Sequence, residues 1–199
     1  MTPKHEKPVL FTHARDSWNN ACIQPFGDNW TTYALGYKKA ADLMVAHIDE
    51  HHRDQDTLVY PILFLYRQYI ELRLKHLARD ASEVLDQDYE LPKTHRLLDL
   101  WRPLKSKVLE IEKRFGRMGD REVLEKAERI LMALGDIDPV SDAFRYPVNT
   151  KGDPSIDHTV RLINVRHFKE QVAEVAVLLE GINIHVDVLA DMKSDYVAE

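Results

Sequence analysis

Glycine, proline and cysteine are scarce in this chain. Its 199 residues include seven glycines, nine prolines and the single cysteine Cys22. Such sparing use of turn-forming residues favours long helices over many short strands. One cysteine excludes an internal disulfide and is typical of a reducing compartment. No apolar run approaches the roughly 18 residues of a membrane span, and residues 1–20 contain no apolar signal-peptide core. We therefore expect a soluble, cytoplasmic protein without membrane contact.

Several familiar catalytic signatures are also missing. The sequence contains no GxxxxGK[ST] phosphate-binding loop, no GxGxxG dinucleotide fingerprint, no GxSxG nucleophile elbow and no kinase signature. No cofactor or bound metal is therefore predicted. The net charge of −6 argues against a protein whose whole surface binds nucleic acid.

One segment, residues 93–117, departs from this acidic balance. Its eight basic residues are Lys93, Arg96, Arg102, Lys105, Lys107, Lys113, Arg114 and Arg117. Only three acidic residues, Asp99, Glu110 and Glu112, oppose them. Such a strip can bind phosphate, although a solvated helix face is the more common explanation.

Apolar residues recur at three- and four-residue steps in five segments, which predicts five amphipathic helices. The expected ranges are 30–52, 58–78, 95–115, 120–134 and a last helix that begins at the N-cap Asn164 and passes residue 186. The second helix has the widest apolar face and should be central, with Pro61 in its first turn. Pro103 should kink or restart the third helix.

The remaining segments are expected to be irregular. Residues 1–28 should form an extended arm, residues 80–92 a polar loop, and residues 136–157 the main irregular stretch. A short β-hairpin near residues 144–165, pairing 144–148 with 159–165, is an alternative to a plain loop. The predicted fold is thus all-α, a single helical bundle over residues 1–199.

Two clusters could carry chemistry on the early helices. Arg67, Glu71 and Lys75 follow one another at four-residue steps on the most apolar helix, so they must be paired. A structural ion-pair ladder is the more common explanation, and a binding role is the alternative. His47 and His51 could share a metal, but no zinc-site spacing accompanies them, and a solvated helix end explains them better.

Two further clusters lie in the second half of the chain. Arg145 and Tyr146 precede the rigid Pro147 and could hold a phosphate or a partner, or Arg145 could cap a helix or pair with an acid such as Glu71. Arg161 and His167 combine a phosphate-neutralising cation with a general acid/base. Taken alone, such a pair more often consists of two exposed loop residues.

Three motifs in order resemble the HEPN superfamily, the higher eukaryotes and prokaryotes nucleotide-binding domains. YPILFLYRQYIELRLKHL (residues 60–77) resembles the family helix with an E-x-x-x-K core. KTHRLLDLW (residues 93–101) resembles the H-x-L-x-x-L segment that follows it, and FRYP (residues 144–147) resembles the RYP motif of several HEPN families. The matched region, residues 58–199, would be the HEPN-like core.

The resemblance implies a helical bundle, often a homodimer, in toxin–antitoxin or phage-defence systems. Some members are metal-independent endoribonucleases with an R-x(4–6)-H motif, and others are non-catalytic RNA- or nucleotide-associated modules. By this resemblance Arg161 would steady the scissile phosphate and His167 would help to activate the ribose 2′-hydroxyl. A polar residue usually follows the family arginine, whereas Leu162 follows it here.

Two functional hypotheses follow. In the first, the chain binds or cleaves RNA or a nucleotide as a homodimer. In the second, it is a non-enzymatic module for a protein partner or small ligand. Under the second hypothesis four residues would form a buried polar cluster that shapes the fold or a pocket: Arg67, Glu71, His95 and Arg145.

Overall fold

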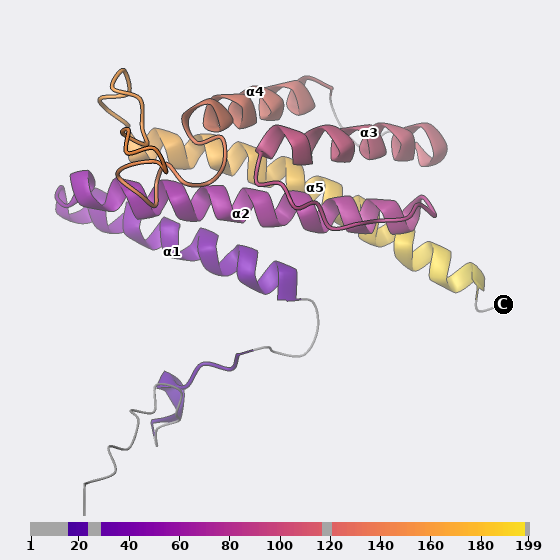
Figure 1. Ribbon diagram of the computed structural model, residues 1–199. Coiled ribbons are helices and arrows are strands. Elements are labelled where there is room, and N and C mark those ends of the chain that lie inside the picture. The colour runs from indigo at the N-terminus through magenta and orange to yellow at the C-terminus, as the bar shows by residue number, and fades with distance from the viewer. Residues whose placement is uncertain (1–15, 24–28, 117–120, 198–199) are drawn as a thin grey trace, which may run out of the picture.

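The computed structural model describes residues 16–23, 29–116 and 121–197. Within them the chain is all-α, as predicted, and contains no strand (Figure 1). A short 3₁₀ helix, Ser17–Asn19, precedes five α-helices. These are α1 (Asn29–His51), α2 (Gln55–Val84), α3 (Leu97–Phe115), α4 (Arg121–Ile137) and α5 (Val165–Val197).

Helix α2 is the centre of the bundle. It packs against α1, α3 and α5, while α4 bridges α3 and α5 (Figure 1). Its side chains are buried on several faces, including Ile62, Tyr66, Ile70, Leu74 and Leu77. A wide apolar face requires neighbours all round, because each apolar side chain left in water forfeits its transfer free energy. The central position predicted for this helix is therefore confirmed.

Local chemistry explains several helix ends. Asn164 caps α5, since its side-chain oxygen accepts a hydrogen bond from the His167 backbone N–H at 3.0 Å. Helix α3 ends at Gly116, whose φ of +108° is strained for any residue with a Cβ. The end of α3 and the start of α5 thus agree with the predicted helix over residues 95–115 and the predicted N-cap Asn164.

Helix α2 is longer at both ends than expected. It begins at Gln55, which makes Pro61 its seventh residue, so the predicted place in the first turn is wrong. It also continues through residues 80–84, which were expected in a loop. Ala81, Ser82 and Val84 are buried there, and the Ser82 hydroxyl donates to the Ala78 carbonyl at 2.6 Å. Burial and an internal hydrogen bond thus override the polar sequence.

Helix α3 runs through Pro103 without restarting. The missing N–H deprives only the carbonyl of Asp99, and Asp99 is exposed to water. Of the two alternatives for residues 144–165, the plain loop is observed, and the hairpin between 144–148 and 159–165 does not form. A single antiparallel bridge, Val148 to Pro154, is all the pairing in this segment.

Most of the predicted N-terminal arm, residues 1–15 and 24–28, lies outside the described residues. Within the described ranges, every helix is too short or too polar to cross a bilayer.

The core predicts an asymmetry between two leucines. Leu74 is fully buried in α2, whereas Leu43 in α1 is 63% exposed. We expect Leu74→Ala to lower the free energy of unfolding by about 2–5 kcal/mol, because it leaves a cavity. The same substitution at Leu43 should change it by less than about 0.5 kcal/mol. Urea denaturation of both variants checks this, and equal losses would contradict the central position of α2.

Candidate functional site

The irregular segment between α4 and α5, residues 138–164, lies at the end of the bundle where α1 ends and α2 and α5 begin (Figure 1). Arg166 in α5 closes this end by an ion pair with Asp49 in α1, with Nη2 and Oδ1 2.6 Å apart. The hydrogen bonds that Arg166 donates to Asp49 raise the pKa of its guanidinium. The segment is therefore bounded by three helices.

A buried guanidinium anchors the segment to α2. Arg67 is 0% exposed, and its Nε and Nη2 donate to the Asp138 carbonyl oxygen at 3.2 and 3.1 Å. Nη2 also donates to the His95 carbonyl oxygen at 2.7 Å, and Nη1 to Glu71 Oε2 at 3.1 Å. One side chain thus joins α2, the chain before α3 and the chain after α4.

Glu71 and Asp138 balance the charge of this network. Glu71 Oε1 lies 2.8 Å from both Lys75 Nζ and His95 Nδ1. Arg67 Nε lies 3.1 Å from Asp138 Oδ2 and forms an ion pair with it. The Nε hydrogen itself is donated to the Asp138 carbonyl oxygen, so Oδ2 accepts no hydrogen bond from the described residues. Two cations face two carboxylates, as burial requires.

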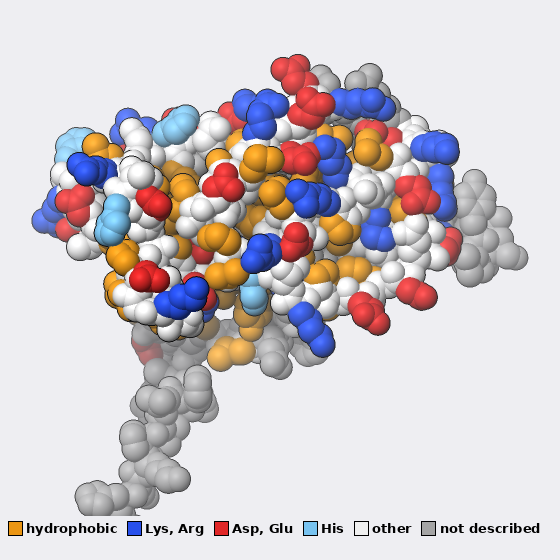
Figure 2. Space-filling view, turned by 45° about the horizontal axis from the view of Figure 1, so that its top comes forward, with side chains coloured by type: hydrophobic (Ala, Val, Ile, Leu, Met, Phe, Trp, Pro, Cys, Tyr) orange, Lys and Arg blue, Asp and Glu red, His pale blue; other side chains and the backbone are white. Residues whose placement is uncertain are grey.

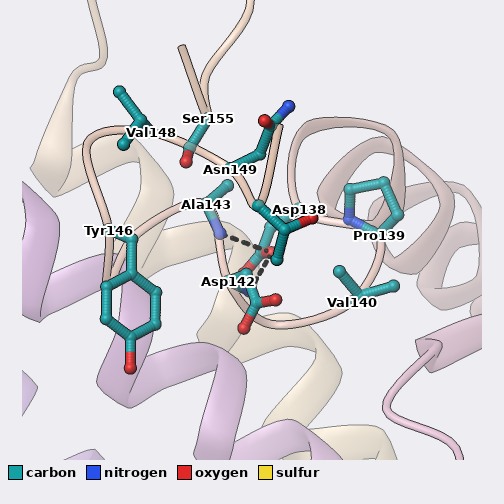
Figure 3. A pocket seen from close by; sticks show the side chains of 10 residues that line it. Asp138, Pro139, Val140, Asp142, Ala143, Tyr146, Val148, Asn149 and Ser155 are labelled. Carbon is teal, nitrogen blue, oxygen red and sulfur yellow. Dashed lines mark hydrogen bonds between the residues drawn. The ribbon is translucent and has the colours of Figure 1, made fainter. Parts of the chain in front are cut away.

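Asp138 also shapes the start of the segment. Its Oδ1 accepts hydrogen bonds from the backbone N–H groups of Asp142 and Ala143 at 2.8 and 3.0 Å (Figure 3). Ser141, with a φ of +69°, is held in place by the Gln68 side chain, whose amide donates to its hydroxyl at 2.8 Å. Asp138 was missed from the sequence, because one acid before Pro139 carries no recognisable signal.

Arg145 does not join the cluster of Arg67, Glu71 and His95; it pairs with an acid, as one alternative had it, but that acid is Asp142 and not Glu71. Its Nε donates to the Ser141 carbonyl at 2.6 Å and its Nη2 pairs with Asp142. The guanidinium carbon lies 5.3 Å from the centre of the Tyr146 ring and 5.9 Å from that of Phe64. Both carboxylate oxygens of Glu71 already have partners, which are Arg67, Lys75 and His95.

Two adjoining cavities flank Tyr146. We call the first, of about 420 Å³, the aromatic pocket; it is lined by Tyr60, Phe144, Arg145, Tyr146, Pro147 and Pro154, among others. We call the second, of about 470 Å³, the polar pocket; it is lined by Asp138, Asp142, Tyr146, Asn149, Thr150 and Ser155, among others (Figure 3). Both volumes are in the range of small-ligand sites.

Arg161 and His167 are not brought together by a direct contact. Both are exposed, and no hydrogen bond or ion pair joins them in the described chain. Arg161 precedes α5 while His167 is in its first turn, 3.7 Å from Glu170. Leu162 between them is 95% exposed. A single subunit therefore presents the two side chains separately.

The histidines at the end of α1 have local partners. The rings of His47 and His51 stack with centroids 4.4 Å apart. His47 Nε2 lies 2.8 Å from Asp54 Oδ2, and this hydrogen bond holds the pKa of the Asp54 carboxyl below its ordinary value. Over residues 16–23, 29–116 and 121–197, no three His, Cys, Asp or Glu side chains are grouped to hold a metal ion.

The basic strip of residues 93–117 is partly neutralised. Lys105 pairs with Glu128, Lys107 bonds to Gln87, and Arg114 pairs with Glu110. Figure 2 shows basic and acidic side chains interspersed over one face, without a single continuous basic patch. Arg117 lies outside the described residues. Among the described cations of the strip, Lys105 and Arg114 are therefore paired with acids, while Lys107 bonds to a neutral amide.

The buried network yields a stability prediction. Arg67→Met should lower the free energy of unfolding by about 3–5 kcal/mol, because it leaves Asp138 buried without a cation and Glu71 with Lys75 as its only paired lysine or arginine. Arg114→Met is the matched control, since that exposed pair should contribute less than about 1 kcal/mol. Chemical denaturation measures both. Similar small losses would show that Arg67 does not hold the segment.

Comparisons with known proteins do not assign the chain to a family. No protein-family model matches it, and neither a curated protein nor a solved structure gives a match. The HEPN resemblance therefore rests on the three sequence motifs, and it stays a prediction.

Proposed function

We propose that this chain is a HEPN-like protein that binds a ribonucleotide, free or within single-stranded RNA, through the aromatic pocket. The proposal extends to a homodimer acting in the cytoplasm, in a toxin–antitoxin or phage-defence setting. Two of the three motifs behind the resemblance supply Glu71 and His95, which are 2.8 Å apart, and the third supplies Arg145 and Tyr146 of the pocket.

The aromatic pocket carries the proposal. Tyr60 and Tyr146 line it and are 49% and 55% exposed, so that both rings are accessible to a ligand. Arg145 lies against the Tyr146 ring, and two prolines stiffen the wall. Planar bases stack on tyrosine rings and on guanidinium planes, and this mode is typical of single-stranded RNA recognition. Shape and chemistry thus favour a planar heterocycle.

A cation is available for the phosphate that a nucleotide brings. Arg145 uses its Nε and Nη2 for Ser141 and Asp142, while its Nη1 makes no hydrogen bond to a described residue. Guanidinium groups are well suited to phosphate because they donate in a planar fork.

Metal-independent RNA cleavage is the second candidate function. It is favoured by the exposure of Arg161 and His167, at the same end of the bundle as the pockets. In the proposed homodimer a second subunit would complete the arrangement around the scissile phosphate. The His167 imidazole would then take the 2′-hydroxyl proton.

Binding is tested with three tyrosine variants. Tyr60→Ala and Tyr146→Ala should each weaken binding of a fluorescent oligoadenylate RNA by about 5- to 100-fold, the loss expected for one base–aromatic stack. Tyr33→Ala is the control, because Tyr33 is 54% exposed on α1 and lines neither pocket. Fluorescence anisotropy measures the affinities, and adenosine monophosphate as competitor distinguishes free nucleotide from RNA as the ligand. Equal affinities for all three variants would rule out the aromatic pocket.

Cleavage is tested separately. Purified protein in EDTA should degrade total RNA, and His167→Ala should reduce the rate by at least about 100-fold, the contribution typical of one general base. His158→Ala serves as control, since His158 is another exposed histidine of the same segment. Equal rates for the two variants would exclude a catalytic His167, while leaving ribonucleotide binding in place.

A further inference from the structure

The polar pocket contains hydrogen-bonding atoms that the described protein does not use. Ser155 Oγ is buried without a partner, which is rare in folded proteins. Asn149 Oδ1 accepts from the Lys151 and Asp153 backbone N–H groups, and its side-chain NH₂ makes no bond to a described residue. The Tyr146 hydroxyl is likewise unbonded among the described residues. Two hydroxyls, an amide NH₂ and two carboxylates therefore line one cavity, beside apolar residues that include Pro139, Val140 and Val148 (Figure 3).

The charges of this pocket disfavour phosphate. No lysine or arginine lines it, and its two ionisable carboxylates are Asp138 and Asp142. Each is already paired with an arginine, Arg67 and Arg145 respectively, which also leaves little attraction for a cationic ligand. An uncharged group with several hydroxyls fits such a lining, because carboxylate, amide and hydroxyl groups all exchange hydrogen bonds with it.

The two pockets adjoin. Ala143, Tyr146 and Ser155 line both of them, so that a ligand whose ring lay in the aromatic pocket would have its next group beside the polar pocket. In a nucleotide the group next to the base is the sugar. Building on the proposed function, we infer that the polar pocket binds the ribose and distinguishes it from deoxyribose through Asp142 and Ser155.

The chemistry of the 2′-hydroxyl matches these two residues. It is both donor and acceptor, and its presence is what allows a protein to tell RNA from DNA. One carboxylate oxygen of Asp142 faces Arg145, which leaves the other to accept from the sugar. Ser155 Oγ would then gain the partner that it lacks within the protein. Deoxyribose lacks this hydroxyl and offers neither group a partner at that position.

The test compares an oligoadenylate RNA with DNA of the same sequence by fluorescence anisotropy. The wild-type chain should bind RNA about tenfold more tightly, the loss expected when one charge-assisted hydrogen bond is removed. Asp142→Asn and Ser155→Ala should each reduce the RNA-to-DNA affinity ratio to within about threefold of unity. The ratio is the readout because a change in base stacking or in overall charge affects both nucleic acids alike.

Asp153→Asn is the matched control. It removes one carboxylate charge from an exposed residue of the same segment that does not line the polar pocket, so the preference for RNA should persist. Equal binding of RNA and DNA by the wild-type chain would overturn the inference and leave base binding intact. An RNA preference unchanged in Asp142→Asn and Ser155→Ala would overturn the placement of the ribose. Failure to bind either nucleic acid would overturn the proposed function as well.

Discussion

The burial of the Arg67 guanidinium is the constraint on which the rest of this structure depends. A fully buried cation is tolerated only when carboxylates and carbonyl oxygens replace its water. Here they come from three places in the chain: Glu71 on α2, His95 before α3 and Asp138 after α4. The connections between helices are consequently fixed in position by the same side chain that lies in the central helix.

This constraint explains how an irregular segment can carry a site. A loop without regular hydrogen bonds loses conformational entropy when it is ordered, and the anchor has to offset that loss. Asp138, bonded to Arg67, organises the backbone of Asp142 and Ala143, the residues directly before the aromatic run. Tyr146 and Arg145 are thereby exposed on a backbone that Asp138 and Arg67 hold in place. Such preorganisation lowers the entropic cost of binding a ligand.

The sequence was informative about periodic elements and poor about the contacts between them. Apolar residues at three- and four-residue steps located all five helices and the central role of α2, and Asn164 marked the start of the last one. Residues 80–84 misled, because their burial extends α2 into a stretch whose polar sequence is typical of a loop. Arg67, Glu71 and His95 do meet, whereas Arg145 does not, since three cationic or imidazole groups already occupy Glu71. Asp138 has no local pattern and was visible only in three dimensions.

The two proposed functions, ribonucleotide binding and RNA cleavage, differ in how firmly the structure holds the residues that they need. Binding needs a surface whose shape exists before the ligand arrives, and the segment after Asp138 has such support from α2. Catalysis needs a base and a cation held within a fraction of an ångström of productive geometry by their own neighbours. Arg161 has no bond to a described residue, and His167 is held only through its backbone N–H and a 3.7 Å contact with Glu170. The proposed cleavage would therefore need a second subunit to confine these side chains, whereas the proposed ribonucleotide binding would use a frame that a single subunit already contains.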